Sequence, residues 1–137
     1  DREFLSKLDK VLVRNGDSVL LSETVSDNWI EVCNYALKHQ SVALYSSNKL
    51  KVSKNSIQFL TGTNGIATDA VWGYIFYYAN NMVRYFQVPR TQYTYHRDSY
   101  VKCYPRSENP RISLVVDQDL DVKFLRLHNS KLLEKGQ

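Results

Sequence analysis

The stretch VWGYIFYYANNMVRYFQV, residues 71 to 88, determines the fold class, because it can be read either as one helix or as two strands. Its apolar side chains recur at helical spacing, yet Gly73, Asn80 and Asn81 are unfavourable in a helix interior. The run is also dense in aromatic side chains, which strands prefer. We therefore predict a β-hairpin with a two-residue turn at Asn80 and Asn81, since asparagine tolerates the positive φ that such turns require.

This turn sets the register of the predicted hairpin and places Ile75 opposite Phe86. Because side chains alternate across a strand, each face then has a defined composition. One face carries Val71, Ile75, Tyr77, Met82, Arg84, Phe86 and Val88, and the other carries Trp72, Tyr74, Phe76, Tyr78, Val83 and Tyr85. Both faces are largely apolar, so we expect the hairpin to be covered on both sides; the alternative is an exposed aromatic platform on one side.

Two helices are predicted on the N-terminal side of the hairpin. The first begins at Asp1 and ends before Asn15 and Gly16, and the second begins at Asp27 and Asn28, whose side chains can cap its free amides. The apolar residues at helical spacing are Phe4, Leu5, Leu8, Val11 and Leu12 in the first helix and Trp29, Ile30, Cys33, Ala36 and Leu37 in the second.

Short runs rich in β-branched and aromatic residues predict further strands on both sides of the hairpin. A β-meander is expected over residues 41–45, 50–53 and 56–61, and later strands over 91–97, 101–104, 112–116 and 122–127. Residues 91–97 hold little aliphatic side chain, so we place this strand at a sheet edge. The order of elements predicts an α+β fold in which two N-terminal helices pack on one antiparallel sheet of about five to seven strands.

The composition fits one soluble globular domain over residues 1–137, because 43% of the residues are hydrophobic and 23% are charged. With 5 glycines and 3 prolines, the chain excludes collagen-like repeats. No run reaches the roughly 18 apolar residues that a membrane-spanning helix needs, and the first residues lack an apolar signal segment. Since residue 1 is not Met, we expect the domain to be excised from or processed out of a larger protein.

Positive charge is concentrated in the middle of the chain. The formal net charge is +4, and residues 32 to 111 hold 10 Lys and Arg against 3 Asp and Glu. Such a stretch favours anionic partners if it forms one surface, whereas a solvated basic surface needs no partner.

Aromatic residues interleave with these cations. Single-stranded nucleic acid binding uses this combination, because each stacked base contributes about 1 to 3 kcal/mol and cations neutralise phosphates. The candidate binding residues are Trp72, Tyr74, Tyr78, Arg84, Tyr85, Arg90, Tyr93, Tyr95, Arg97, Lys102 and Arg106, with Tyr104 beside them. We therefore predict a non-enzymatic domain without a cofactor that binds RNA or single-stranded nucleic acid through a basic, Tyr-rich central sheet.

Two other function classes remain open at this point. The edge strand around Tyr93 and Tyr95 could serve a protein-protein interaction or a homo-oligomer, by strand addition. A small metal-independent nuclease could use His96 and His128 as general acid and base, beside Arg84, Arg97 or Lys102. For these two histidines and for His39, a surface or hydrogen-bonded structural role is the favoured interpretation.

No metal site is predicted from the carboxylates Asp117, Asp119 and Asp121. The segment fails the EF-hand pattern, because Val122 stands at the sixth position and His128 at the twelfth, so we expect a polar turn. The cysteines Cys33 and Cys103 are expected to be two free thiols in a reducing, intracellular compartment, cytoplasmic or nuclear, although one disulfide between them is open.

Overall fold

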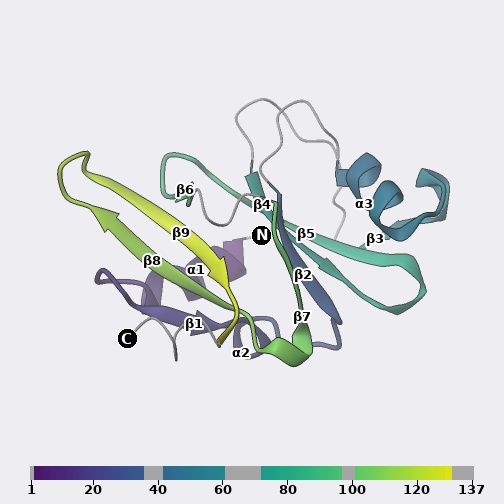
Figure 1. Cartoon of the computed structure of the whole chain (residues 1–137), viewed down its shortest axis with the longest axis horizontal. Coiled ribbons are helices and arrows are strands. Elements are labelled where there is room, and N and C mark those ends of the chain that lie inside the picture. The colour runs from purple at the N-terminus through teal and green to yellow at the C-terminus, as the bar shows by residue number, and fades with distance from the viewer. Residues whose placement is uncertain (1, 36–41, 61–71, 97–100, 131–137) are drawn as a thin grey trace.

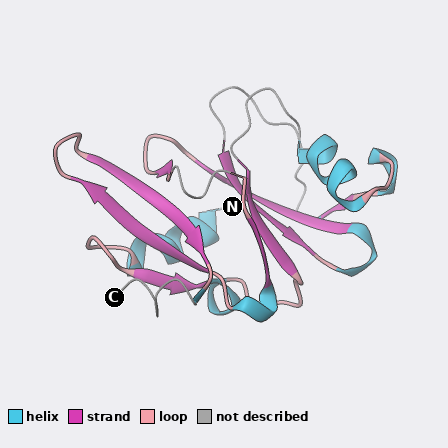
Figure 2. Cartoon of the chain, in the orientation of Figure 1, coloured by secondary structure: helices cyan, strands magenta, loops and turns pink. Residues whose placement is uncertain are grey.

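A computed structural model describes residues 2–35, 42–60, 72–96 and 101–130 of the chain. Its helices are α1 (Arg2–Val11), α2 (Leu21–Thr24) and α3 (Val42–Leu50), with single 3-10 turns at Lys54–Ser56, Ala79–Asn81 and Arg106–Glu108. Its strands are β1 (Ser18–Leu20), β2 (Glu31–Tyr35), β3 (Gln58–Phe59), β4 (Trp72–Tyr77), β5 (Met82–Val88), β6 (Thr94–Tyr95), β7 (Cys103–Pro105), β8 (Arg111–Asp117) and β9 (Val122–His128). Figure 2 shows how these strands dominate the described chain.

The strands form two sheets. The central sheet has the order β3-β5-β4-β2-β7, and the outer sheet has the order β1-β8-β9-β6. Most neighbours are antiparallel, but β3 runs parallel to β5 and β6 runs parallel to β9. The α+β class is therefore confirmed, whereas the predicted single antiparallel sheet beneath two N-terminal helices is not, since the described chain has 4-stranded and 5-stranded mixed sheets.

The central sheet is covered on both faces (Figure 1). One face packs its aromatic side chains against Phe4 and Leu8 of α1 and against Leu114 and Leu125 of the outer sheet. The opposite face packs against Val42 of α3. All residues from Trp72 to Tyr78 are buried as a result, so the expectation of a doubly covered hairpin is confirmed and the exposed aromatic platform is wrong.

The hairpin exists as predicted, but its register differs by one residue. Ile75 pairs with Tyr85 rather than with Phe86. The connection is the three-residue turn Ala79–Asn81, closed by a 2.8 Å hydrogen bond from the Tyr78 amide to the Met82 carbonyl. Both asparagines have the positive φ that was expected, 63° and 60°.

This shift of one residue moves every β5 side chain to the other face, because strand side chains alternate. Phe86 and Val88 therefore pack with Trp72 and Tyr74, while Tyr85 packs with Ile75 on the face below α3. The predicted composition of both faces is wrong for β5, and Val71 lies outside the described residues.

Helix α1 confirms the first predicted helix, but the second is wrong. Residues 31–35 form β2, which lies between β4 and β7 in the central sheet. Val32, Cys33, Asn34 and Tyr35 are all buried, because both faces of this strand are covered. A strand buried on two faces has no polar alternation, so its apolar residues also fit helical spacing.

The predicted meander over residues 41–61 is also wrong for most of its length. Val42 to Leu50 form α3. Within the predicted run 56–61, the only strand in the described part of the chain is the two-residue β3. Contacts with the central sheet hold the helix: Ser46 Oγ lies 3.0 Å from the Tyr77 hydroxyl, and Lys49 forms a 3.0 Å ion pair with Glu31. These tertiary contacts override the local preference of the segment for strand.

The C-terminal strands agree better with prediction. β8 and β9 confirm the strands expected at 112–116 and 122–127, and β7 overlaps the strand expected at 101–104. The strand expected over 91–97 is reduced to β6, which does lie at the edge of the outer sheet.

Cys33 and Cys103 form a disulfide between β2 and β7, at paired positions of the two strands and 70 residues apart in sequence. The expectation of two free thiols is therefore wrong. The disulfide also does not clearly fit the reducing compartment that we expected, since disulfides persist mainly in oxidising surroundings.

Candidate nucleic-acid interface

The aromatic residues of the predicted binding surface lie inside the protein. Trp72 and Tyr74 are fully buried, and Tyr78, Tyr85 and Tyr93 are at most 7% exposed. Burial raises the pKa of each of these tyrosines well above its usual range. A buried ring presents no face to a nucleic-acid base, so the stacking role predicted for these five residues has no structural support.

Two of the predicted arginines hold the loop before β2 in place. Arg84 forms a 3.5 Å ion pair with Asp27, whose carboxylate also accepts the Tyr78 hydroxyl at 2.8 Å. Arg106 donates from Nη1 to the backbone carbonyls of Asp27 and Trp29, and its guanidinium lies 4.8 Å from the centre of the Trp29 ring. Both guanidinium groups are therefore engaged in contacts within the protein.

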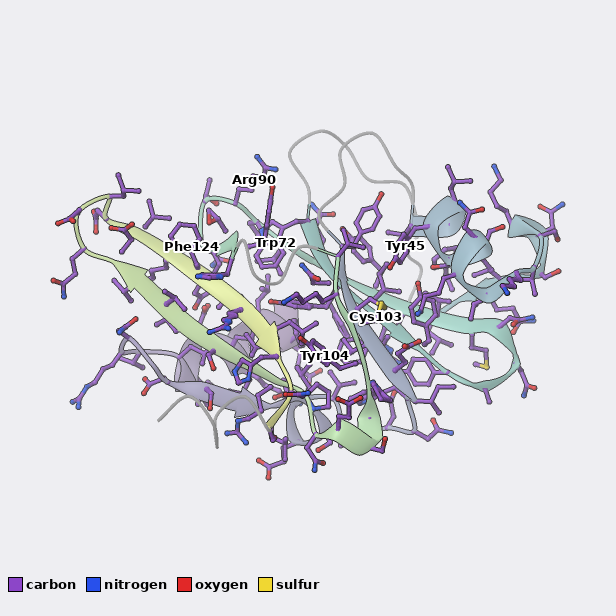
Figure 3. All side chains as sticks on the ribbon, viewed as in Figure 1. Tyr45, Trp72, Arg90, Cys103, Tyr104 and Phe124 are labelled. Carbon is purple, nitrogen blue, oxygen red and sulfur yellow. A yellow bond between two sulfur atoms is a disulfide. The ribbon has the colours of Figure 1, made fainter. Side chains whose placement is uncertain are left out.

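The remaining candidates differ in exposure. Arg90 and Lys102 are exposed, and Figure 3 shows Arg90 pointing away from the body of the protein. Tyr95 is half-buried with its ring edge-on to Trp72, at 5.9 Å between centroids. Arg97 and His39 lie outside the described residues.

A different surface combines cations with accessible aromatic rings. β8 and β9 pair so that Arg111 lies opposite His128, Ser113 opposite Arg126, and Val115 opposite Phe124. Alternate residues of both strands, such as Leu114 and Leu125, point into the core, so these six lie on the other side of the sheet. We call this side the arginine face and define it by Arg111, Ser113, Val115, Phe124, Arg126 and His128.

Two half-buried rings lie near Arg126. Phe124 is two residues away on the same strand, and the His96 ring meets it edge-on at 6.0 Å. Tyr104 of β7 packs against the main core and lies close enough to Arg126 for the arginine charge to oppose the effect of burial, which raises the Tyr104 pKa. Figure 3 labels Phe124 on β9 and Tyr104 on β7, across the junction of the two sheets.

A buried pair, Ser113 and His128, lies between the two arginines of this face. Nδ1 of His128 lies 2.9 Å from the Asn129 carbonyl, which can only accept, so Nδ1 carries the proton and Nε2 accepts from the Ser113 hydroxyl at 2.6 Å. Burial lowers the pKa of His128, and the nearby charges of Arg126 and Arg111 lower it further. With both ring nitrogens bonded and 2% of its surface exposed, His128 has the hydrogen-bonded structural role that we favoured.

The two histidines of the nuclease alternative lie at different points of the outer sheet. His96 contacts Phe124, and His128 follows four residues later on the same strand. Four residues of strand extend about 13 Å, which is too far for one acid and one base to act on a single phosphodiester.

The carboxylates at the tip of the β8–β9 hairpin form the polar turn that we expected. Asp117 accepts the amide of Leu120 at 3.1 Å, and Asp121 has a φ of 52°. Within the described ranges, no three His, Cys, Asp or Glu side chains lie together as a metal site would require.

Sequence reasoning missed Arg111, Arg126 and Phe124 as candidate binding residues. A signal was present, because a turn at residues 117–121 fixes which residues of the flanking strands share a face. Arg111 and Arg126 then fall on one side of the hairpin, and the core residues Ile112, Leu114, Leu125 and Leu127 fall on the other.

Comparisons with protein-family models, with curated proteins and with solved structures found no match in any of the three. The structure itself shows an α+β fold with two mixed sheets and a basic, partly aromatic face. None of the helices in the described segments is long and apolar enough to cross a membrane.

The buried neutral His128 makes stability depend on pH. Its pKa in the folded protein lies below the ordinary value of 6.5, so the unfolded chain takes up the proton first as the pH falls. Between about pH 7.5 and 5.5 the free energy of unfolding should therefore decrease on acidification, by at most about 1.4 kcal/mol per pH unit. Urea unfolding of the wild type and of His128→Gln measures this; identical pH dependence in both proteins would contradict the prediction, since all other groups are common to both.

Proposed function

We propose that this protein is a non-enzymatic domain that binds RNA or single-stranded nucleic acid through the arginine face, and not through the interior of the central sheet. One observation carries the proposal: Arg111 and Arg126 lie on neighbouring strands of one sheet face, which also holds the half-buried ring of Phe124. Guanidinium groups contact phosphates, and accessible rings stack on unpaired bases.

The arrangement suits a single strand better than a duplex. An aromatic ring in a sheet face can stack on an unpaired base. The bases of a duplex are already stacked on one another, so their faces are not accessible to such a ring. The described helices α1 and α3 pack on the central sheet, so neither projects from the arginine face as a groove-reading helix would.

The site also supports binding without chemistry. Ser113 is 9% exposed and His128 is 2% exposed, and the two side chains are bonded to each other. We assign them the role of fixing the spacing of the two strands that carry the arginines.

Charge reversal of the two arginines tests the proposal. We expect Arg111→Glu and Arg126→Glu each to weaken binding of a labelled single-stranded RNA at least about tenfold at about 50 mM salt. Each loss of a phosphate contact should also flatten the dependence of affinity on salt between about 50 and 200 mM, by about one unit of the log-log slope. Fluorescence anisotropy measures both quantities, and circular dichroism confirms that each variant is folded.

Lys51→Glu and Lys54→Glu are matched controls, because both lysines are exposed at the α3 end, opposite the β8–β9 hairpin in Figure 1. They change net charge equally and should change binding little. Equal losses in all four variants would show a delocalised charge effect and contradict the proposal. Absence of RNA binding, together with a mass that rises with concentration in light scattering, would instead favour assembly through the edge strand β6.

A further inference from the structure

A pocket lies beside the start of β9, and none of the six residues that define the arginine face lines it. It has a volume of about 560 Å³ and is formed by α1, by the turn that follows β5, and by the start of β9. Ligand pockets of small molecules have volumes of about 300 to 1,000 Å³. The side chains that matter here are Asp9, Arg90, Gln92, Val116, Asp121 and Lys123.

The pocket holds two cations and two carboxylates that do not neutralise each other. Arg90 and Lys123 line it together with Asp9 and Asp121, yet the described residues form no ion pair among these four. Asp9 is already engaged, because it accepts the Tyr93 hydroxyl at 2.5 Å. Asp121 is exposed at the β8–β9 turn, which makes it the carboxylate more accessible to a ligand. Lys123 lies two residues beyond it at the start of β9, and Arg90 comes from the turn that follows β5.

The turn that carries Arg90 is held in place. The Pro89 carbonyl accepts the amides of Gln92 and Tyr93, at 3.1 and 3.2 Å, and so closes the turn that presents Arg90. Trp72 donates from Nε1 to the Tyr93 carbonyl at 3.0 Å, which ties the same turn to the central sheet. A site assembled on fixed elements loses little conformational freedom when a ligand binds.

The remaining lining chemistry indicates the kind of ligand. Gln92 contributes a polar side chain, and Val116 contributes apolar surface. A ligand that matches the lining needs separate negative and positive groups, polar atoms between them and some apolar surface.

We propose that this pocket binds a short zwitterionic peptide, with the peptide carboxylate at Arg90 and Lys123 and its ammonium group at Asp121. Carboxylate recognition by a guanidinium is strong and directional, and an ammonium group pairs with a single carboxylate. The backbone amides of the peptide supply the polar atoms between the charges. The proposal is independent of RNA binding, because no residue that defines the arginine face lines the pocket.

Titration with trialanine, followed by NMR of the backbone amides, tests this inference. Saturable shifts should appear at residues 90–94 and 121–123, with a Kd of about 1 mM or tighter. The amide-capped and the N-acetylated tripeptides, which each lack one charge, should bind at least about tenfold more weakly than trialanine.

Variants assign each charge to its partner. The double variant Arg90→Gln/Lys123→Gln should bind trialanine and its amide-capped form equally, while Asp121→Asn should bind trialanine and its N-acetylated form equally. Asn tolerates the positive φ of 52° at residue 121, so this substitution preserves the turn. Asp119→Asn and Lys54→Gln are matched controls away from the pocket lining and should retain the full preference for trialanine.

Three results would overturn the inference: no saturable shift with trialanine, equal binding of all three tripeptides, or the same shifts with inorganic phosphate, which would indicate a plain anion site. Arg111→Glu should leave trialanine binding unchanged, so failure of this inference and failure of the RNA proposal are separately visible.

Discussion

Reduction of the Cys33–Cys103 disulfide is expected to lower the free energy of unfolding by about 4 kcal/mol. The bond closes a loop with a sequence separation of 70 residues, which contains α3 and the strands from β3 to β6. A cross-link between residues this far apart strongly reduces the conformational entropy of the unfolded chain. When the bond is broken, the unfolded chain regains this entropy, and unfolding becomes more favourable. The edge strand β7 also loses its covalent attachment to β2.

Urea unfolding with and without dithiothreitol measures this effect. Cys33 is fully buried, so the reductant must act on the chain in denaturant and the protein must then refold. The variant Cys33→Ala/Cys103→Ala is the control, because it should show the lower stability and no response to dithiothreitol. Titration of two thiols per chain confirms that the disulfide is reduced. If the urea midpoint of the reduced wild type is then unchanged, the cross-link contributes nothing to stability.

Replacement of Gly73 by alanine is expected to destabilise the fold by about 3 kcal/mol, at the upper end of the range for overpacked cores. Gly73 lies on β4 opposite Gln87 of β5. A Cβ atom there would lie 2.1 Å from the Phe86 carbonyl oxygen and 3.0 Å from the Gln87 Cα. Both are backbone atoms, so the strands must separate and their ladder must distort to accept a single methyl group.

Gly16→Ala is the matched control for this prediction. A Cβ atom at residue 16 meets nothing within 4 Å, but the φ of 93° is unfavourable for alanine, so a loss of about 1 kcal/mol is expected. Thermal and urea unfolding of both variants give the comparison. A smaller loss for Gly73→Ala than for Gly16→Ala would mean that the close approach of β4 and β5 at Gly73 relaxes without cost.

Gly73 illustrates what local sequence can and cannot reveal. A glycine within an aromatic strand signals close contact with another backbone, and it correctly weakens the helical interpretation of residues 71–88. The atoms that approach it belong to β5, and their identity depends on the register. The expected two-residue turn misplaced this register by one position, because the turn Ala79–Asn81 uses one more residue.

The candidate site also shows what local sequence can reveal and what it cannot. A run of tyrosines and arginines predicts a binding surface, yet Tyr74 and Tyr85 serve as core residues, since the central sheet is covered on both faces. Arg84 and Arg106 anchor the loop at Asp27. The pair Arg111 and Arg126 is a better candidate, although 15 residues separate them, because β8 and β9 bring them to one face.

Local patterns were sufficient where an element has one buried and one exposed side. Helix α1 and the strands β8 and β9 were predicted on this basis, since their apolar residues repeat at the period of the element. Strand β2 is buried on both faces, so it has no such contrast. Helix α3 buries Ser46 and exposes Leu44, so its apolar residues do not mark its buried side, and contacts with Tyr77 and Glu31 hold it in place. Their form, the Cys33–Cys103 bond and the surface on which the arginines meet were decided by tertiary packing, because contacts between distant segments contribute more free energy than the preference of any short segment alone.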